Sequence, residues 1–387
     1  MATQLTINTL TKLISFDTTS VHSNLALMAY IQSFLNEYGV ESTLDYNQEK
    51  TKANLYATIG PIEKPGILLS GHTDTVPVKG QSWSTDPFKL TFLDNKAFGR
   101  GTADMKSFIA VALASVPKML SANLTKPIHF AFSYDEEIGC LGVRSLIEKL
   151  KHLDVKPAAC IVGEPTKMKL VTSHKGKLAA RVTVTGKECH SGMAPHGVNA
   201  VNYAARLVNW LENAANDKAQ NGPFHTQYDI PYSTIHTGII QGGTALNIVP
   251  NHCQFDFEIR NIADDNPQDL LGHFTDYCQE LIGEMTQKAS DTDIAIEVLT
   301  EYPGLAKAND DAIISYLKNL TDDAEEGQIN FGTEGGLFSE HLKLPTVVCG
   351  PGSMQQGHKP DEFIYIEQLA KSEAFIERLI DSLSESP

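Results

Sequence analysis

Acidic and histidine side chains follow several short apolar runs of this chain, which cover residues 67–69, 128–132, 161–162 and 347–348. The side chains concerned are His72, Asp74, Asp104, Glu136, Glu137, Glu164 and His358. Imidazole nitrogens and carboxylate oxygens are common ligands of divalent metals. Two imidazoles and three or four carboxylates at strand ends suit two adjacent cations. The pattern therefore predicts metal-assisted hydrolysis rather than redox or phosphate chemistry.

The spacing within two motifs predicts different roles for neighbouring residues. His72 and Asp74 are two apart, so in a strand they point to the same side. The carboxylate can then accept a hydrogen bond from the far imidazole nitrogen and fix its tautomer. Glu136 and Glu137 are adjacent and face opposite ways in an extended segment. One of them can bind metal while the other stays uncoordinated and carries a proton.

Each motif has an ordinary interpretation when it is taken alone. A single histidine is commonly a satisfied core or surface residue, and Asp104 could be an acid at a helix N-terminus. The acidic pair could be a solvated turn, and Glu164 a loop acid. Their shared position after apolar runs favours a metal site. Three carboxylates could be balanced by two divalent ions and one hydroxide, whereas without metal some carboxylates would have to protonate.

The first part of the chain alternates predicted helices and strands. Helices are predicted at residues 24–38, 107–120 with a break near Pro117, and 142–153, and strands at 54–59, 66–70, 127–133 and 158–162. Short, continuous apolar runs are typical of strands buried on both faces. The fold class is therefore α/β, with a largely parallel sheet flanked by helices. Ligands of such sheets bind beyond the carboxyl ends of the strands.

A second pattern begins near residue 177. Strand, helix, strand, strand, helix and strand follow in that order, with strands at 177–185, 234–240, 253–259 and 293–299 and the first helix at 199–213. This order predicts an inserted ferredoxin-like α+β domain. The first domain resumes with a helix at 310–320, a strand at 344–349 and a helix at 366–383. We therefore expect a discontinuous catalytic domain (1–178 and 304–387) that carries a lid or dimerisation domain (179–303).

Bulk properties exclude several classes of protein. The formal net charge of −16 argues against a nucleic-acid partner, and no apolar run is long enough to span a bilayer. The six cysteines are scattered and form no CxxC motif, which favours reduced thiols and a cytoplasmic location. The chain has no GxSxG, HExxH, P-loop or GxGxxG motif.

Five motifs in order resemble the co-catalytic zinc metallopeptidase superfamily. They lie at residues 69–76, 101–106, 135–137 and 163–166 and at His358, and the similarity runs over nearly the whole chain. The resemblance implies two divalent metal ions, zinc first and cobalt as the alternative. It implies that His72 and Glu164 hold one ion, Glu137 and His358 hold the other, and Asp104 bridges them. Glu136 would be the general acid and base, and Asp74 would orient His72.

The resemblance also implies roles for three residues of the inserted domain. His190 would reach the active site of the partner subunit in a homodimer formed through the lid, and would stabilise the oxyanion. Asn247 and Arg260 would grip the substrate carboxylate, for which an arginine fork is well shaped. Arg260 taken alone could equally be a surface charge at a strand end. A cis peptide bond is expected after Asp104.

Within the superfamily, residues 230–235, 331–334, 349–354 and 357–362 resemble those of bacterial members that deacetylate an amino acid. This implies hydrolysis of N2-acetyl-L-ornithine to L-ornithine and acetate, a step of arginine biosynthesis. Small departures from relatives, such as Gly335 and Gly336 after Glu334, leave a related deacylase or dipeptidase as the alternative. A non-catalytic metal-binding relative is a third hypothesis, but such a protein is expected to have lost Glu136, which is present here.

Overall fold

The computed structural model describes residues 2–308, 310–321 and 325–385. The chain forms two compact units. The first comprises Met1–Ser173, Leu305–Gln328 and Thr333–Pro387, and the second comprises His174–Gly304 and Ile329–Gly332. The lid predicted at residues 179–303 lies within the second unit. Each unit has its own buried apolar core.

An eight-stranded mixed sheet forms the centre of the first unit, in the order β1-β2-β6-β3-β7-β14-β8-β13. Its central strands run parallel and every residue in them is buried: β6 (Ile128–Ser133), β3 (Ile67–His72), β7 (Ala159–Pro165) and β14 (Thr346–Gly350). The flanking strands are β1 (Ser42–Tyr46), β2 (Ala53–Ile59), β8 (Leu170–His174) and β13 (Glu326–Ile329). Strands β2 and β8 are antiparallel to their central neighbours. The predicted α/β class with a largely parallel sheet is confirmed.

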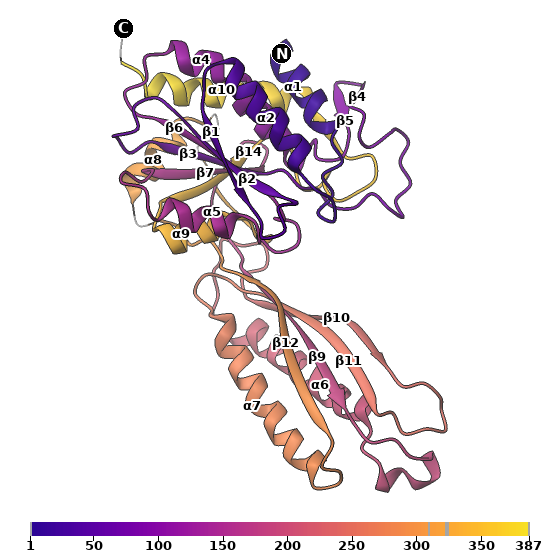
Figure 1. Cartoon of the computed structure of the whole chain (residues 1–387). Coiled ribbons are helices and arrows are strands. Elements are labelled where there is room, and N and C mark those ends of the chain that lie inside the picture. The colour runs from indigo at the N-terminus through magenta and orange to yellow at the C-terminus, as the bar shows by residue number, and fades with distance from the viewer. Residues whose placement is uncertain (1, 309, 322–324, 386–387) are drawn as a thin grey trace. The chain divides into compact units, whose positions relative to one another are not determined.

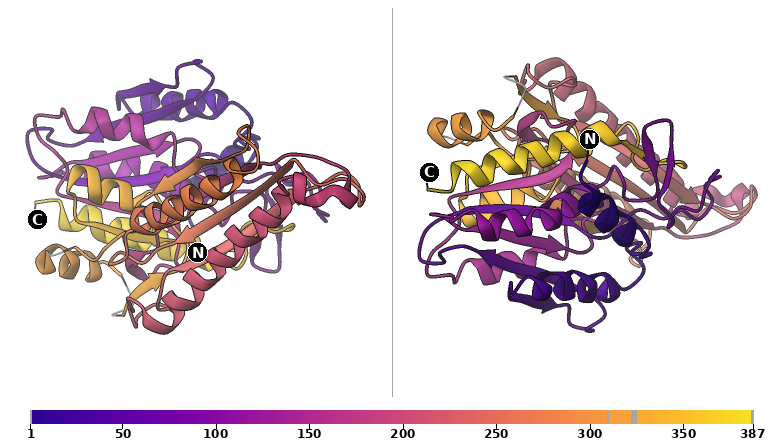
Figure 2. Two further views of the ribbon diagram at one scale, coloured as in Figure 1. Left: turned by 90° about the horizontal axis from the view of Figure 1, so that it is seen from below. Right: turned by 90° about the horizontal axis from the view of Figure 1, so that it is seen from above.

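Helices cover both faces of this sheet (Figure 1). One layer contains α1 (Gln4–Ile14), α2 (Leu25–Glu37), α3 (Lys106–Ala114), α4 (Val116–Ser121) and α10 (Ile366–Ser382). The other contains α5 (Val143–Leu150) and α9 (Gly335–Leu342), while α8 (Asp311–Lys318) precedes β13. The N-terminal segment lies beside α10, as Figure 2 shows, and the backbone N–H of Thr3 donates to Glu373 Oε1 of this helix at 2.8 Å.

The second unit contains a four-stranded antiparallel sheet in the order β10-β11-β9-β12. The strands are β9 (Lys177–Thr185), β10 (Thr234–Gly242), β11 (His252–Arg260) and β12 (Asp293–Tyr302). Alternate residues of β9 are buried, beginning with Leu178, because one sheet face packs against α6 (Ala200–Asn221) and α7 (Pro267–Thr286). Figures 1 and 2 show both helices on this face. The predicted ferredoxin-like order is confirmed.

Several elements differ from the prediction or were absent from it. The helix predicted at 107–120 is divided at Ser115, and Pro117 lies in the first turn of α4, where its missing N–H removes no hydrogen bond. Helix α6 continues to Asn221, eight residues beyond its predicted end. The prediction lacked α1, α9, β1, β8, β13 and the small sheet of β4 (Thr91–Leu93), β5 (Lys96–Phe98) and β15 (Phe363–Tyr365).

Candidate metal centre

Three adjacent parallel strands of the first unit bring the acidic motifs to one sheet edge. His72 is the last residue of β3, and Glu164 is the sixth residue of β7. Glu136 and Glu137 follow β6 after a short turn, and Asp104 lies two residues before the first residue of α3. Strands β6, β3 and β7 are neighbours in the sheet and run in the same direction. Their carboxyl ends therefore lie together, as expected for a ligand site in an α/β sheet.

Asp104 lies between two imidazoles, one on each carboxylate oxygen. Its Oδ1 is 3.0 Å from His72 Nε2, and its Oδ2 is 3.1 Å from His358 Nε2. Glu164 Oε1 is 3.5 Å from the same nitrogen of His72, and Glu137 Oε2 is 3.1 Å from the same nitrogen of His358. The site therefore has two halves, each with one imidazole and one glutamate, joined by a single aspartate. The peptide bond that follows Asp104 is cis, as the resemblance implied.

The contacts of Asp74 differ in part from those predicted. His72 Nδ1 is 3.0 Å from the backbone oxygen of Asp74 and 3.5 Å from its carboxylate Oδ1. The carboxylate also accepts hydrogen bonds from the backbone N–H groups of Glu136 (3.1 Å) and Glu137 (3.2 Å) and from the Ser20 hydroxyl (2.7 Å). Asp74 therefore contacts both His72 and the segment that carries the two glutamates.

The two adjacent glutamates take different positions. Glu137 lies against His358, whereas Glu136 groups with His72 and Glu164, one ligand atom of each lying within 4.8 Å of the others. A second such group joins His72, Asp104 and Glu137. Glu136 Oε1 also accepts a weak hydrogen bond from Cys140 Sγ at 3.4 Å. Geometry alone thus allows Glu136 either to bind an ion or to stay beside one, and its predicted uncoordinated role stays a prediction.

Crowding of buried acids shifts the pKa values of the whole cluster. Burial, with the nearby charge of Asp104, raises the pKa of Glu137 to about 7 and that of Glu164 well above its ordinary value. Burial and the neighbouring acids likewise raise the pKa of Glu136. Hydrogen bonds to Asp104 and Glu137 raise the pKa of His358 to about 10. Burial opposes protonation of His72, but Glu164 and Asp104 outweigh it and raise its pKa.

The donor set fits divalent metal ions. Within the described part of the chain, Glu137 Oε1 is buried without a hydrogen-bond partner, which is costly for a carboxylate oxygen unless something else binds it. Without metal, the raised pKa values favour the protonated forms of the three glutamates and the cationic forms of both histidines, whereas the pKa of Asp104 is lowered by its two imidazole neighbours. Divalent cations would replace those protons and suit a mixed imidazole and carboxylate site.

Comparison with known proteins decides the family. The model of Peptidase family M20/M25/M40 matches residues 68–382. Acetylornithine deacetylase from Pasteurella multocida is 33% identical over 92% of this chain and 91% of its own length. The enzyme of that name from Photorhabdus laumondii is 33% identical over 93% of this chain and 90% of its own length. The chain belongs to the M20 peptidase family.

Solved structures show the same fold at low sequence identity. A tripeptidase from Staphylococcus aureus covers 100% of both chains with a TM-score of 0.77 and 21% identity. A metallo-carboxypeptidase of the M20 family from Sulfolobus solfataricus covers 98% of this chain and 99% of its own, with a TM-score of 0.78 and 18% identity. The M20 membership confirms the resemblance predicted from the motifs. None of the helices in the described residues is both long and apolar enough to cross a membrane.

The predicted catalytic His190 and the two predicted substrate-binding residues, Asn247 and Arg260, of this M20 protein lie in the second unit. His190 and Asn247 are exposed neighbours, because the N–H of Ser191 donates to the backbone oxygen of Asn247 at 3.0 Å. Arg260 lies apart from this backbone contact, at the end of β11. Its guanidinium donates to both carboxylate oxygens of Glu258, at 3.1 and 3.2 Å, and to the hydroxyl of Tyr302 at 3.2 Å. Arg260 would have to exchange part of this pairing to bind a substrate carboxylate.

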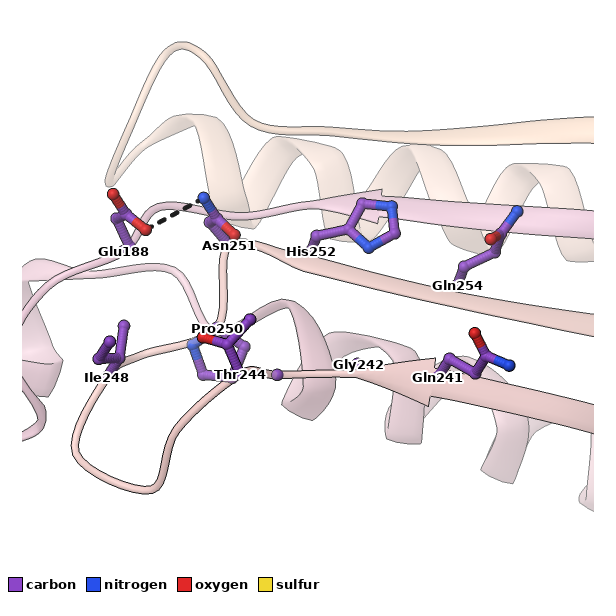
Figure 3. A pocket seen from close by; sticks show the side chains of 10 residues that line it. Glu188, Gln241, Gly242, Thr244, Ile248, Pro250, Asn251, His252 and Gln254 are labelled. Carbon is purple, nitrogen blue, oxygen red and sulfur yellow. Dashed lines mark hydrogen bonds between the residues drawn. The ribbon is translucent and has the colours of Figure 1, made fainter.

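A pocket of about 220 Å³ opens beside this backbone contact in the second unit (Figure 3). Six of its ten lining residues have polar side chains; the lining consists of Glu188, Gln241, Gly242, Gly243, Thr244, Ile248, Pro250, Asn251, His252 and Gln254. Asn251 donates to Glu188 at 3.2 Å across one end. Ile248 directly follows Asn247, so the pocket adjoins the predicted substrate residues.

Sequence reasoning missed several buried polar residues around the site. Glu334 is 1% exposed and accepts hydrogen bonds from the hydroxyls of Ser70 and Ser133, in the two strands that lead to His72 and the glutamate pair. Arg100 and Glu362 form a fully buried ion pair beside Asp104. Their positions in the sequence could have indicated a role at the site, because Arg100 lies four residues before Asp104 and Glu362 lies four residues after His358.

Proposed function

We propose that this M20 protein is a dinuclear metal-dependent amidohydrolase that converts N2-acetyl-L-ornithine and water into L-ornithine and acetate, in arginine biosynthesis in the cytoplasm. The observation that carries the metal-dependent chemistry is Asp104, whose two oxygens each face one imidazole and glutamate pair. Support for the substrate comes from relatives named acetylornithine deacetylase, at 31–33% identity over more than 90% of this chain.

In this proposal five side chains hold two metal ions. His72 and Glu164 would bind one ion, Glu137 and His358 the other, and Asp104 both. The two oxygens of Asp104, each beside a different imidazole, support this stoichiometry. Zinc is the first choice and cobalt the alternative, since both suit mixed imidazole and carboxylate ligands. When bound, such ions supply an acidified water and polarise the amide carbonyl.

The protein's own residues would move the proton and hold the substrate. Glu136 lies beside His72 and Glu164, where its carboxylate could take a proton from the attacking water and return it to the departing amine. Asp74 holds the backbone of Glu136 in place. His190 would stabilise the oxyanion from the partner subunit of a lid-mediated homodimer. Asn247 and Arg260 would bind the substrate carboxylate, the latter through its planar fork.

A related deacylase or dipeptidase is the nearest rival activity. The solved tripeptidase and carboxypeptidase are at most 21% identical to this chain and share its fold alone, so they favour no particular substrate. A non-catalytic metal-binding role is the other hypothesis, and the presence of Glu136 in the cluster argues against it.

A substrate panel tests the proposal. We expect kcat/KM to be highest on N2-acetyl-L-ornithine when it is compared with N-acetylmethionine, N-succinyl-diaminopimelate and a dipeptide. The zinc-loaded protein should lose this activity after exhaustive chelation and regain it with zinc or cobalt. A preference above about tenfold for another substrate would overturn the substrate assignment, since tenfold equals about 1.4 kcal/mol of transition-state binding. Equal amide hydrolysis by the fully chelated protein would overturn the metal mechanism.

A further inference from the structure

His358 differs from the other candidate metal ligands in how the fold supports it. Its side chain is 44% exposed, whereas those of His72, Asp104, Glu137 and Glu164 are 1–7% exposed. It lies in the loop between β14 and β15 rather than at a strand end, and its φ of 59° is in the left-handed region, which is uncommon for a non-glycine residue. Strand packing therefore does not fix this imidazole, and something else must.

Gln81, from a different loop, contacts the backbone of His358. Its amide nitrogen Nε2 donates to the His358 carbonyl oxygen at 3.2 Å. Its amide oxygen Oε1 accepts from Arg100 Nη2 at 2.6 Å and from Trp83 Nε1 at 3.1 Å. The donors of Arg100 and Trp83 fix which end of the Gln81 amide is the oxygen. The nitrogen is thereby directed at the His358 carbonyl.

Arg100 and Glu362 anchor Gln81 to the buried part of the site. Arg100 Nη1 donates to Glu362 Oε2 at 2.5 Å, and both side chains are 1% exposed. Glu362 Oε1 accepts from the backbone N–H groups of Ala103 (2.8 Å) and Asp104 (3.1 Å). One chain of contacts therefore runs from the backbone of Asp104 through Glu362, Arg100 and Gln81 to the backbone of His358.

We propose that Gln81 is a positioning residue for the metal half-site formed by His358 and Glu137, held in register with Asp104 by the Arg100–Glu362 ion pair. This inference rests on the proposed dinuclear centre. Outer-shell partners orient first-shell ligands, and losing one costs about 10–100-fold in metal affinity. Among the five proposed metal ligands, all of which lie in the described residues, Gln81 has a direct hydrogen bond to His358 alone, so its loss should affect one ion more than the other.

Metal titration of the full-length protein tests this proposal. Zinc would be titrated into chelator-stripped wild type, Gln81→Ala and Gln81→Glu, with a competing chelator to resolve the two affinities. We expect both variants to weaken one zinc at least about tenfold and to leave the other within about twofold. Gln81→Glu keeps an acceptor for Arg100 but replaces the donor to the His358 carbonyl with an anionic oxygen, whereas Gln81→Ala removes both contacts without adding a charge.

Two controls separate positioning from general loosening of the structure. Gln32→Ala removes another half-buried glutamine of the same unit, which donates to Ser42 at 3.3 Å, and should change neither zinc affinity. In a double-mutant cycle, Gln81→Ala should add almost nothing to His358→Ala, because both act on the same ligand.

Three results would overturn the proposal while leaving the dinuclear centre intact. They are unchanged zinc affinities in Gln81→Ala, an equal loss at both ions, and a full additional loss on top of His358→Ala. A wild-type protein that binds fewer than two zinc ions would instead overturn the dinuclear centre itself, and this inference with it.

Discussion

Asp74 is a buried residue that contacts several neighbours around the site. Its carboxylate accepts hydrogen bonds from two consecutive backbone amides and from the Ser20 hydroxyl, and its backbone oxygen accepts from His72. The carboxylate lies within 3.5 Å of the His72 imidazole. One side chain therefore fixes both the imidazole and the turn that follows β6. The His-x-Asp spacing predicted the first contact, but the contact with the glutamate turn depends on strand order, which no local pattern contains.

Replacing Asp74 by asparagine tests this dual contact. The asparagine amide keeps one acceptor oxygen and places an NH₂ group against a backbone N–H, so one buried donor loses its partner. We expect the free energy of unfolding to fall by roughly 1–3 kcal/mol, measured by urea denaturation. Asp86→Asn, at an exposed aspartate that also accepts from a backbone N–H, is the control and should be nearly neutral. Equal stability of the two variants would contradict the buried role of Asp74.

Glu136→Gln separates metal binding from proton transfer. Glutamine has nearly the same shape but cannot accept and return a proton at neutral pH. If Glu136 is uncoordinated, the variant should keep two zinc ions per chain while kcat falls by at least ~10⁴-fold, beyond the usual range for general acid–base catalysis. Metal analysis and steady-state kinetics on the same sample measure both quantities. Loss of an ion would show that Glu136 is a ligand, and unchanged turnover would refute the proposed mechanism.

At the scale of elements, the strands next to the candidate metal ligands are the ones that the sequence predicts most directly. Strands β3, β6 and β7 are buried throughout, so they are short continuous apolar runs, and the motifs follow them directly. Strands β1 and β13 have only one fully buried position between them, and β8 is buried yet contains Thr172, Ser173 and His174. Their pairing comes from the neighbouring strands rather than from their own pattern. The last turns of α6 (residues 214–221) are mostly polar, which explains their absence from the prediction.

Strand β6 also contains a titratable group outside the site, His129. It is 3% exposed, and its Nδ1 lies 2.9 Å from the Tyr56 hydroxyl and 3.0 Å from the Thr58 hydroxyl, both on β2. Burial lowers its pKa to about 4. Between pH 6.5 and 4 the unfolded chain therefore binds a proton that the folded chain does not. The free energy of unfolding must fall as the pH falls through this window, by up to about 3 kcal/mol from this residue.

His129→Asn removes this pH dependence while keeping a hydrogen-bonding group near the Nδ1 position. Urea denaturation of wild type and variant at several values between pH 7 and pH 4.5 would measure it. We expect the stability advantage of the wild type to shrink as the pH falls, because only the wild type gains a proton on unfolding at this position. The other titrating groups are common to both proteins and cancel in the difference. Parallel stability curves would contradict the lowered pKa of His129.

At the scale of the whole molecule, the chain consists of two units with separate cores, and the predicted functions are divided between them. The candidate metal centre belongs to the first unit, and His190, Asn247 and Arg260 belong to the second. The sequence motifs predict the content of each unit because each has its own periodicity and its own core. The motifs cannot specify whether a lid acts on the metal centre of its own chain or on that of its partner. In the proposed homodimer, this would depend on contacts between the two subunits. The proposed homodimer, in which His190 acts in the partner's active site, is therefore the prediction that the local sequence patterns support least.

Mixing two inactive variants tests that arrangement. Glu136→Gln would disable the metal centre of its own chain, and His190→Ala would disable its lid. If lids act across the dimer, a heterodimer of the two contains one complete site, formed by the intact lid of the first chain and the intact metal centre of the second. Random reassociation of equal amounts makes half of all dimers mixed. Turnover should then recover to about a quarter of the wild-type rate, measured after the two variants are exchanged under mild dissociating conditions.

If His190 acts on its own chain instead, the mixed dimer still contains a centre without Glu136 and a lid without His190, and no activity returns. Full activity of His190→Ala alone would remove the shared site altogether.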